Sequence, residues 1–140
     1  MTAFTATDDV TRIELATIQN LLATTGKAVY VEKEDMIDAT TAISGSGPAY
    51  VYYFMEAMIQ AARQMGFSDS EAELLVVQTF TGAVDLYNKS NFSCEEWIQR
   101  VSSKGGTTEA ALNSFKINTL HQNIIDGTKE ALRRAVELGK

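Results

Sequence analysis

Proline occurs once in the 140 residues, at Pro48, and this scarcity is what most narrows the choice of fold. Proline fixes φ and lacks a backbone N–H, so it ends or kinks most helices that contain it. A chain nearly free of it can form long uninterrupted helices. Pro48 follows the segment Ser44-Gly45-Ser46-Gly47 and suits the first turn of a new helix. We therefore expect one helix to end before this segment and another to begin at it.

Apolar residues recur at helical spacing through most of the chain. Two pairs, Ser68 with Glu71 and Ser93 with Glu96, have the spacing of capping boxes and mark helix starts. A third start is expected at Thr7 or Asp8. The pattern predicts helices over approximately 8–25, 34–43, 48–65, 69–88, 109–117 and 118–138, with a short helix after Ser93.

One segment, Lys27–Val31, reads as a strand, and the sequence shows no second one. A lone strand has no sheet to join. Either it pairs with another copy of the chain, or its sheet belongs to something missing from this chain. The predicted fold class is therefore all-α, a helical bundle with one orphan N-terminal strand.

Charge and cysteine content exclude several classes of function. The formal net charge is −6 and the pI is about 4.7. The chain therefore lacks the excess of positive charge that binding to nucleic acid or an anionic membrane requires. No apolar run is long enough to span a bilayer. Cys94 is the only cysteine and His121 the only histidine, so we expect neither an internal disulfide nor a zinc site, and a reducing cytoplasm fits.

The strongest functional candidate is the stretch from Val101 to Thr108. Gly105 and Gly106 free the backbone of side-chain bulk, and a helix follows Thr107 and Thr108. The N–H groups at a helix start have no intrahelical partner, and the helix dipole favours a carboxylate or phosphate there. A turn closed by a threonine cap would produce the same pattern. Spacing alone leaves both interpretations open.

A second glycine segment, Gly45-Ser46-Gly47, resembles the first half of a dinucleotide fingerprint. The third glycine of that motif would fall at Tyr50, and no strand precedes the segment. Close helix packing explains these small residues better. We therefore predict no cofactor-binding residue and no metal ligand in this chain.

The two segments together, Ser44–Tyr50 and then Val101–Leu112, resemble the C-terminal domain of pyrroline-5-carboxylate reductases. The resemblance covers nearly the whole chain. It implies the two-domain plan of 6-phosphogluconate-dehydrogenase-like proteins, with the Rossmann domain absent. Residues 1–33 would be the last helix and strand of that missing domain. Residues 34–140 would be the helical dimerisation and substrate domain.

The resemblance also implies an activity and a site. The full-length enzyme would reduce 1-pyrroline-5-carboxylate to L-proline with NADPH or NADH, the final step of proline biosynthesis. The substrate carboxylate would lie on Ser103, Gly106, Thr107 and Thr108, held by the N–H groups of the last three and the Thr108 hydroxyl. Thr41 would be the catalytic residue near the substrate ring. Either its hydroxyl bonds the ring nitrogen or relays a proton through water, or it is a helix-interior threonine bonded to its own backbone.

Departures from the family pattern leave other functions open. Lys104 stands where the family usually has proline, Ile117-Asn118-Thr119 replaces a glycine-rich turn, and Trp97 replaces an aliphatic residue. A related imine or keto-acid reductase is one alternative, and Lys104 favours it. A non-catalytic helical dimer is the other.

We expect a homodimer or larger homo-oligomer, with an interface that includes parts of the helices Ala49–Met65 and Ser68–Asn88. The expected partners are a second copy of the chain and the small imino acid, with no nucleic acid and no membrane. We also expect this chain alone to bind no dinucleotide and to be inactive.

Overall fold

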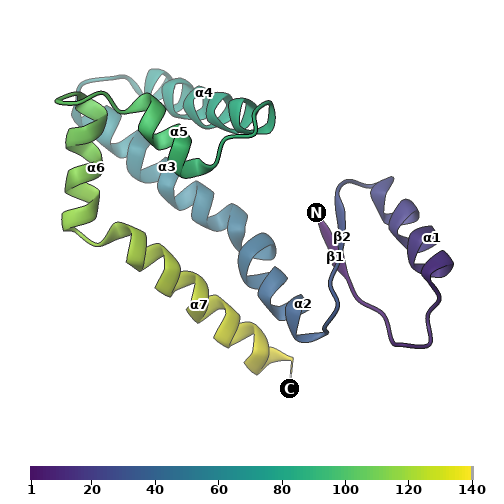
Figure 1. The fold of residues 1–140 in the computed structure, drawn as a ribbon. Helices are drawn as coiled ribbons and strands as arrows, with labels where there is room; N and C mark the ends of the chain where they lie inside the picture. Colours follow the sequence, from purple (N-terminus) through teal and green to yellow (C-terminus); the bar gives the residue numbers. More distant parts are fainter. Residues whose placement is uncertain (140) are drawn as a thin grey trace. The chain divides into compact units, whose positions relative to one another are not determined.

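The computed structural model describes residues 1–139, and these confirm the predicted all-α class (Figure 1). Two short strands and one π-helical turn accompany the α-helices. In chain order the elements are β1 (Thr2–Phe4), α1 (Arg12–Ala23), β2 (Ala28–Tyr30), α2 (Asp35–Thr40), η1 (Thr41–Gly45), α3 (Gly47–Gln64), α4 (Asp69–Asn88), α5 (Cys94–Val101), α6 (Thr107–Ile117) and α7 (Leu120–Leu138).

The chain forms two compact units. The first comprises Met1–Pro48 together with the chain from Ile124 onward, and the second comprises Ala49–Asn123. This division differs from the predicted boundary between residues 33 and 34, which stays a prediction. Residue 140, the last of the predicted second domain, lies outside the described residues.

The predicted strand Lys27–Val31, which the structure contains as β2, has a partner within the chain. The prediction of an orphan strand was therefore wrong. β1 and β2 pair in parallel, with Thr2 opposite Ala28 and Phe4 opposite Tyr30. The rings of Phe4 and Tyr30 meet edge to face, with centroids 5.6 Å apart. A three-residue strand is too short to show alternation, and its partner lies beyond a whole helix. The sequence pattern therefore could not reveal β1.

The first helix starts later than expected because β1 and the turn after it occupy the N-terminal residues. Its N-cap is Thr11, not Thr7 or Asp8. The Thr11 N–H donates to the Glu14 carboxylate at 2.9 Å, and the Thr11 hydroxyl oxygen accepts the Glu14 N–H at 3.4 Å. This is a third capping box, which the sequence analysis missed.

The segment before Pro48 is helical throughout. α2 leads through the π-helical turn η1 into α3, and the Ser46 N–H donates to the Thr41 carbonyl at 2.9 Å. The predicted break between two helices is thus a wider turn with a hydrogen bond five residues back. The small residues permit this winding, which has no clear sequence signature.

The core of the second unit lies between α3 and α4. Both helices have the predicted apolar stripes, and α4 has the predicted capping box of Ser68 and Glu71. The Phe54 and Phe80 rings meet edge to face, with centroids 6.1 Å apart. The buried residues are Ile59, Ala72 and Val76, surrounded by Met55, Met58, Ala62 and Phe80.

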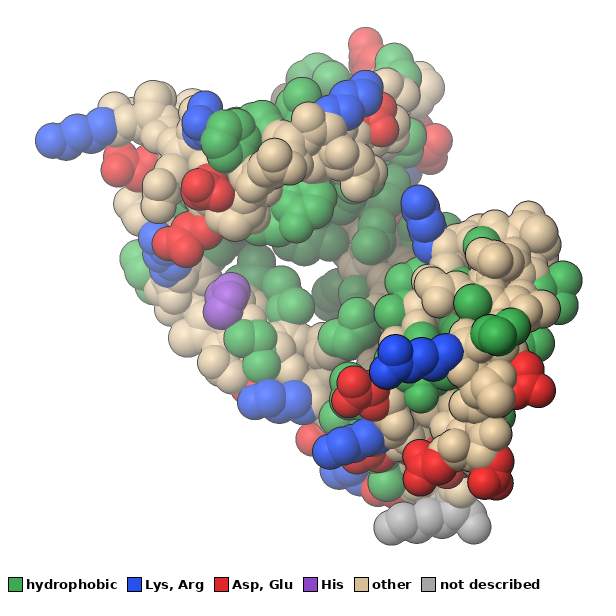
Figure 2. Space-filling view, turned by 45° about the vertical axis from the view of Figure 1, so that its right-hand side comes forward, with side chains coloured by type: hydrophobic (Ala, Val, Ile, Leu, Met, Phe, Trp, Pro, Cys, Tyr) green, Lys and Arg blue, Asp and Glu red, His purple; other side chains and the backbone are tan. Residues whose placement is uncertain are grey.

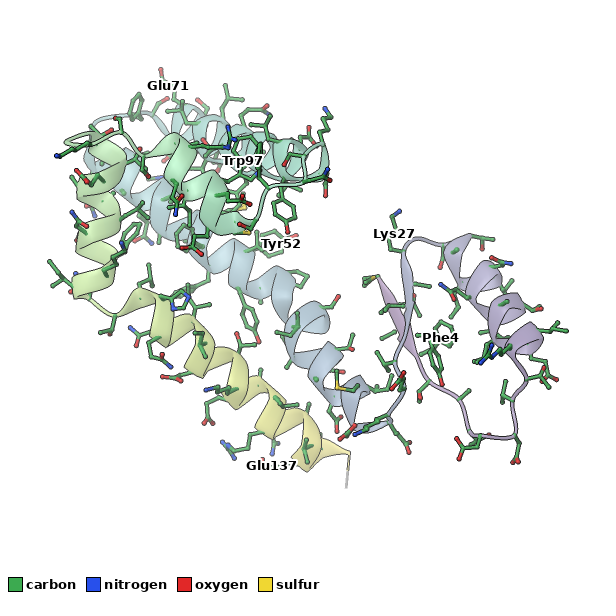
Figure 3. The ribbon with its side chains drawn as sticks, in the orientation of Figure 1. Phe4, Lys27, Tyr52, Glu71, Trp97 and Glu137 are labelled. Carbon is green, nitrogen blue, oxygen red and sulfur yellow. The ribbon has the colours of Figure 1, made fainter. Side chains whose placement is uncertain are left out.

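Trp97 lies on α5 and packs at the start of this helix (Figure 3). The predicted capping box of Ser93 and Glu96 is also present. The Trp97 indole N–H donates to the Ser90 hydroxyl at 2.9 Å, and the Trp97 ring meets Phe92 edge to face. The Arg100 guanidinium lies 3.7 Å above the Phe92 ring. This departure from the family pattern is therefore explained by packing between α5 and the preceding loop.

Candidate functional site

The loop between α5 and α6 needs glycine at two positions, for two different reasons. Gly105 has φ +74°, a left-handed conformation that side chains rarely adopt. At Gly106 a Cβ atom would lie 2.5 Å from the Ser103 hydroxyl oxygen and 3.0 Å from the Ser103 carbonyl oxygen. The loop can therefore fold back onto Ser103 only with these two residues.

Gly106 is the N-cap of α6, so the interpretation as a threonine cap was wrong. Its backbone is extended, and no side chain caps the helix at this residue. Thr107 and Thr108 are the first two residues of α6. Within residues 1–139, no hydrogen bond is found for the N–H groups of Thr107 and Thr108. The structure thus leaves donors at this helix start that can bind an anion.

The N–H group of Gly106 differs from the expectation. It donates to the Ser103 carbonyl at 3.0 Å, closing a tight turn. An anion at this helix start would therefore meet the N–H groups of Thr107 and Thr108, with Gly106 providing room. Ser103 and Gly106 lie in the loop, and Thr107 and Thr108 lie at the start of α6. Their role as the substrate-carboxylate site stays a prediction.

Sequence reasoning missed Glu109 as part of this loop. Its carboxylate accepts the Gly105 N–H at 2.6 Å. The available signal was its position three residues after the cap, where acidic residues often bond back to the preceding backbone. Ser102 lies in the predicted stretch, and its hydroxyl oxygen is buried with no hydrogen-bond partner in the described chain. Lys104 is exposed.

Thr41 belongs to the first unit, whereas the loop belongs to the second. It opens the turn η1, and its hydroxyl donates to the Ile37 carbonyl at 3.0 Å. Of the two alternatives for Thr41, the bond to its own helix backbone is the one that this structure contains. Its hydroxyl oxygen keeps lone pairs that can accept a further hydrogen bond.

A shallow hollow of about 190 Å³ borders Thr41 in the first unit. Short π-helical turns frequently occur at functional sites, and here the turn forms one wall of a hollow. The lining residues come from α2, η1 and the N-terminal strand, and are Met1, Ala3, Ile37, Thr40, Thr41, Ser44 and Gly45.

Gly45 and Gly47 lie within η1 and at the first residue of α3. They therefore do not form a phosphate-binding turn after a strand. In residues 1–139, none of the helices combines the length and hydropathy that crossing a bilayer requires.

The comparisons with known proteins all indicate the same family. The family model described as pyrroline-5-carboxylate reductase dimerisation matches residues 34–138. Pyrroline-5-carboxylate reductase 2 of Bacillus subtilis is 37% identical over 137 residues, covering 98% of this chain and 49% of that protein. The Pseudomonas aeruginosa pyrroline-5-carboxylate reductase is 39% identical over 120 residues, covering 86% of this chain and 44% of that protein.

Solved structures agree with the sequence comparison. A pyrroline-5-carboxylate reductase from Coxiella burnetii superposes with a TM-score of 0.93 at 35% identity, covering 99% of this chain and 51% of that one. The Plasmodium falciparum pyrroline carboxylate reductase with NADP bound gives a TM-score of 0.86 at 28% identity, with 99% and 53% covered. The chain thus spans about half the length of the relatives that it matches.

Proposed function

The chain belongs to the pyrroline-5-carboxylate reductase dimerisation family, and on this basis we propose that it is the dimerisation and substrate-carboxylate domain of such a reductase. The whole enzyme would reduce the C=N bond of 1-pyrroline-5-carboxylate to give L-proline. A hydride would pass from NADPH or NADH to the ring carbon, and a proton would reach the ring nitrogen. The names of the relatives support this reaction, and one related structure has NADP bound.

The observation that carries the proposal is the open start of α6. The N–H groups of Thr107 and Thr108 point from a helix N-terminus that no side chain caps. The substrate carboxylate would accept hydrogen bonds from these two groups and from the Thr108 hydroxyl. Ser103 would line the same side of the loop, since its hydroxyl lies close to Gly106.

Thr41 is the proposed catalytic residue. Its place in a π-helical turn beside the hollow supports this role. To serve the ring nitrogen, its hydroxyl would exchange the bond to Ile37 for one to the substrate or to a bridging water. Thr41→Val should therefore lower kcat, whereas Thr41→Ser should retain it.

We further propose that the chain forms a homodimer or a larger homo-oligomer. The described residues contain only four buried hydrophobic side chains, Ala42, Ile59, Ala72 and Val76. Figure 2 shows many other hydrophobic side chains on the visible surface.

No nucleic acid or membrane partner is proposed, and the cytoplasm is the proposed location. The dinucleotide would bind the whole enzyme and not this chain alone.

Lys104 supports a second candidate, a related imine or keto-acid reductase of the same plan. It is exposed beside the proposed carboxylate site, where the resembling family usually has a stiff proline. Lys104→Pro, assayed against imine and keto-acid substrates, would show whether this residue changes substrate preference.

The decisive experiment uses the full-length reductase that carries this domain. A hydrogen bond to a charged acceptor contributes about 1.5–3 kcal/mol, so Thr108→Val should raise the KM for the imino acid by about tenfold or more. The KM for the dinucleotide should not change. Thr108→Ser, which keeps the hydroxyl, is the matched control. An unchanged imino-acid KM in Thr108→Val would remove the Thr108 hydroxyl from the site.

A further inference from the structure

We propose that Glu109 is a positioning residue of the carboxylate loop. Its side chain fixes Gly105, so that the first N–H groups of α6 stay open to the substrate. This inference rests on the proposed function, because it concerns the same loop. Glu109 itself need not touch the substrate.

Three other helices of the described chain begin with a capping box. In α1, α4 and α5 a glutamate in the third helical position accepts the N–H of its own N-cap residue. The N···O distances are 2.9 Å for Glu14, 2.9 Å for Glu71 and 2.7 Å for Glu96. Each of these glutamates also accepts the hydroxyl of the cap. They complete ordinary capping boxes.

Glu109 occupies the same third position but makes a different bond. Its cap, Gly106, has no hydroxyl, and the Gly106 N–H is already donated to Ser103. The Glu109 carboxylate therefore reaches one residue further back, to the Gly105 N–H at 2.6 Å. Its carboxylate thus ties the loop to the helix, instead of completing a capping box.

The consequence for the loop is a fixed set of donors. The Gly105 and Gly106 N–H groups are both taken, by Glu109 and Ser103 respectively. Thr107 and Thr108 are left to face a ligand. Glycines lose more conformational freedom on ordering than other residues. Without the bond to Glu109, substrate binding itself would have to order Gly105, and affinity would fall.

The test separates the bond from the charge. Glu109→Gln keeps an oxygen that can accept the Gly105 N–H but removes the negative charge. Glu109→Ala removes both. In the full-length reductase we expect Glu109→Ala to raise the imino-acid KM about fivefold to tenfold, with the dinucleotide KM unchanged. The imino-acid KM of Glu109→Gln should equal or fall below the wild-type value, because this variant removes a negative charge beside the proposed anion site. Glu95→Ala, which removes an acid from the first turn of α5, is the matched control.

A second readout uses the 140-residue chain and needs no activity. The Gly105 amide proton should resonate far downfield and exchange slowly in the wild type and in Glu109→Gln. Both signatures should be lost in Glu109→Ala. If Glu109 acts only through its charge, Glu109→Gln and Glu109→Ala should change the imino-acid KM equally, which would overturn the proposal.

A wild-type KM in Glu109→Ala would overturn it too. These failures are distinct from failure of the proposed function. If Thr108→Val raises the imino-acid KM but Glu109→Ala does not, the carboxylate site stands and only the role of Glu109 falls. If neither variant changes the imino-acid KM, the Thr108 hydroxyl is removed from the proposed site and the role of Glu109 falls as well.

Discussion

Thr119 is the residue whose backbone departs most clearly from ordinary geometry. It links α6 to α7 with φ +55°, and it is the only non-glycine residue with positive φ in the described chain. A β-branched side chain in the left-handed region is strained by about 1–2 kcal/mol. The glycine-rich turn of the resembling family would avoid this strain. The departure from the family pattern therefore has a physical cost in this chain.

Thr119→Gly should stabilise the protein by about 1 kcal/mol, because glycine adopts positive φ without a steric penalty. Thermal unfolding of the two proteins, followed by circular dichroism, would measure the difference. Thr128→Gly in the regular part of α7 is the control and should destabilise by about 1 kcal/mol. Equal melting temperatures for wild type and Thr119→Gly would show that the turn carries no strain.

At the level of residues, the sequence predicted which positions form the loop but not which atoms are free. Two adjacent glycines before Thr107 and Thr108 predicted an anion site at a helix start, and this stays a prediction. The bond from Gly106 to Ser103 and the bond from Gly105 to Glu109 depend on the folded path of the loop. Both bonds join residues that are close in sequence. Glycine can adopt several backbone conformations, however, and the sequence alone does not show which of them brings these atoms together.

At the level of elements, the capping boxes are what the sequence identified best. Ser68 with Glu71 and Ser93 with Glu96 both form as predicted, because every atom of the motif lies within four residues. β1 and η1 could not be predicted in the same way. The pairing of β1 depends on a strand more than twenty residues away, and a π turn differs from an α turn by a single hydrogen-bond step.

The capping boxes should make stability depend on pH in the acid range. Hydrogen bonds from Ser68 lower the pKa of Glu71, and those from Ser93 lower the pKa of Glu96, relative to the ordinary value of 4.5. A carboxyl group whose pKa is lower in the folded state adds stability above its unfolded pKa. That stability is lost as the pH falls through the folded pKa. Protonation should therefore weaken both helix starts below pH 4.5.

The double variant Glu71→Gln and Glu96→Gln should flatten this acid dependence. Urea unfolding at pH 7 and at about pH 3 would measure it, and the loss of stability between the two pH values should be smaller than in the wild type. Glu73→Gln, on α4 but outside the capping box, is the control. An unchanged pH dependence in the double variant would show that the boxes do not contribute to acid sensitivity.

At the level of the whole molecule, the apolar surface exceeds what the chain buries by itself. Leu74, Leu75, Val76 and Val77 are consecutive on α4 and so point around most of the helix. Only Val76 is buried, while Leu74 is 62% exposed. A helix that is apolar on most sides needs a second surface to cover it. A second copy of the chain is the occupant that the family suggests, since its model describes a dimerisation domain.

We therefore expect a dimer or larger assembly in sedimentation equilibrium at micromolar concentration. Val77 and Val84 lie seven residues apart on one side of α4 and are 41% and 56% exposed. If this side is part of the interface, the double variant Val77→Glu and Val84→Glu should be monomeric, because burying unpaired charges costs several kcal/mol per site. Gln19→Glu with Asn20→Glu on α1 adds the same charge at polar, exposed positions and should leave the assembly intact. A monomeric wild type would contradict the proposed oligomer, whereas a dimeric Val77→Glu and Val84→Glu variant would show that the subunits meet elsewhere.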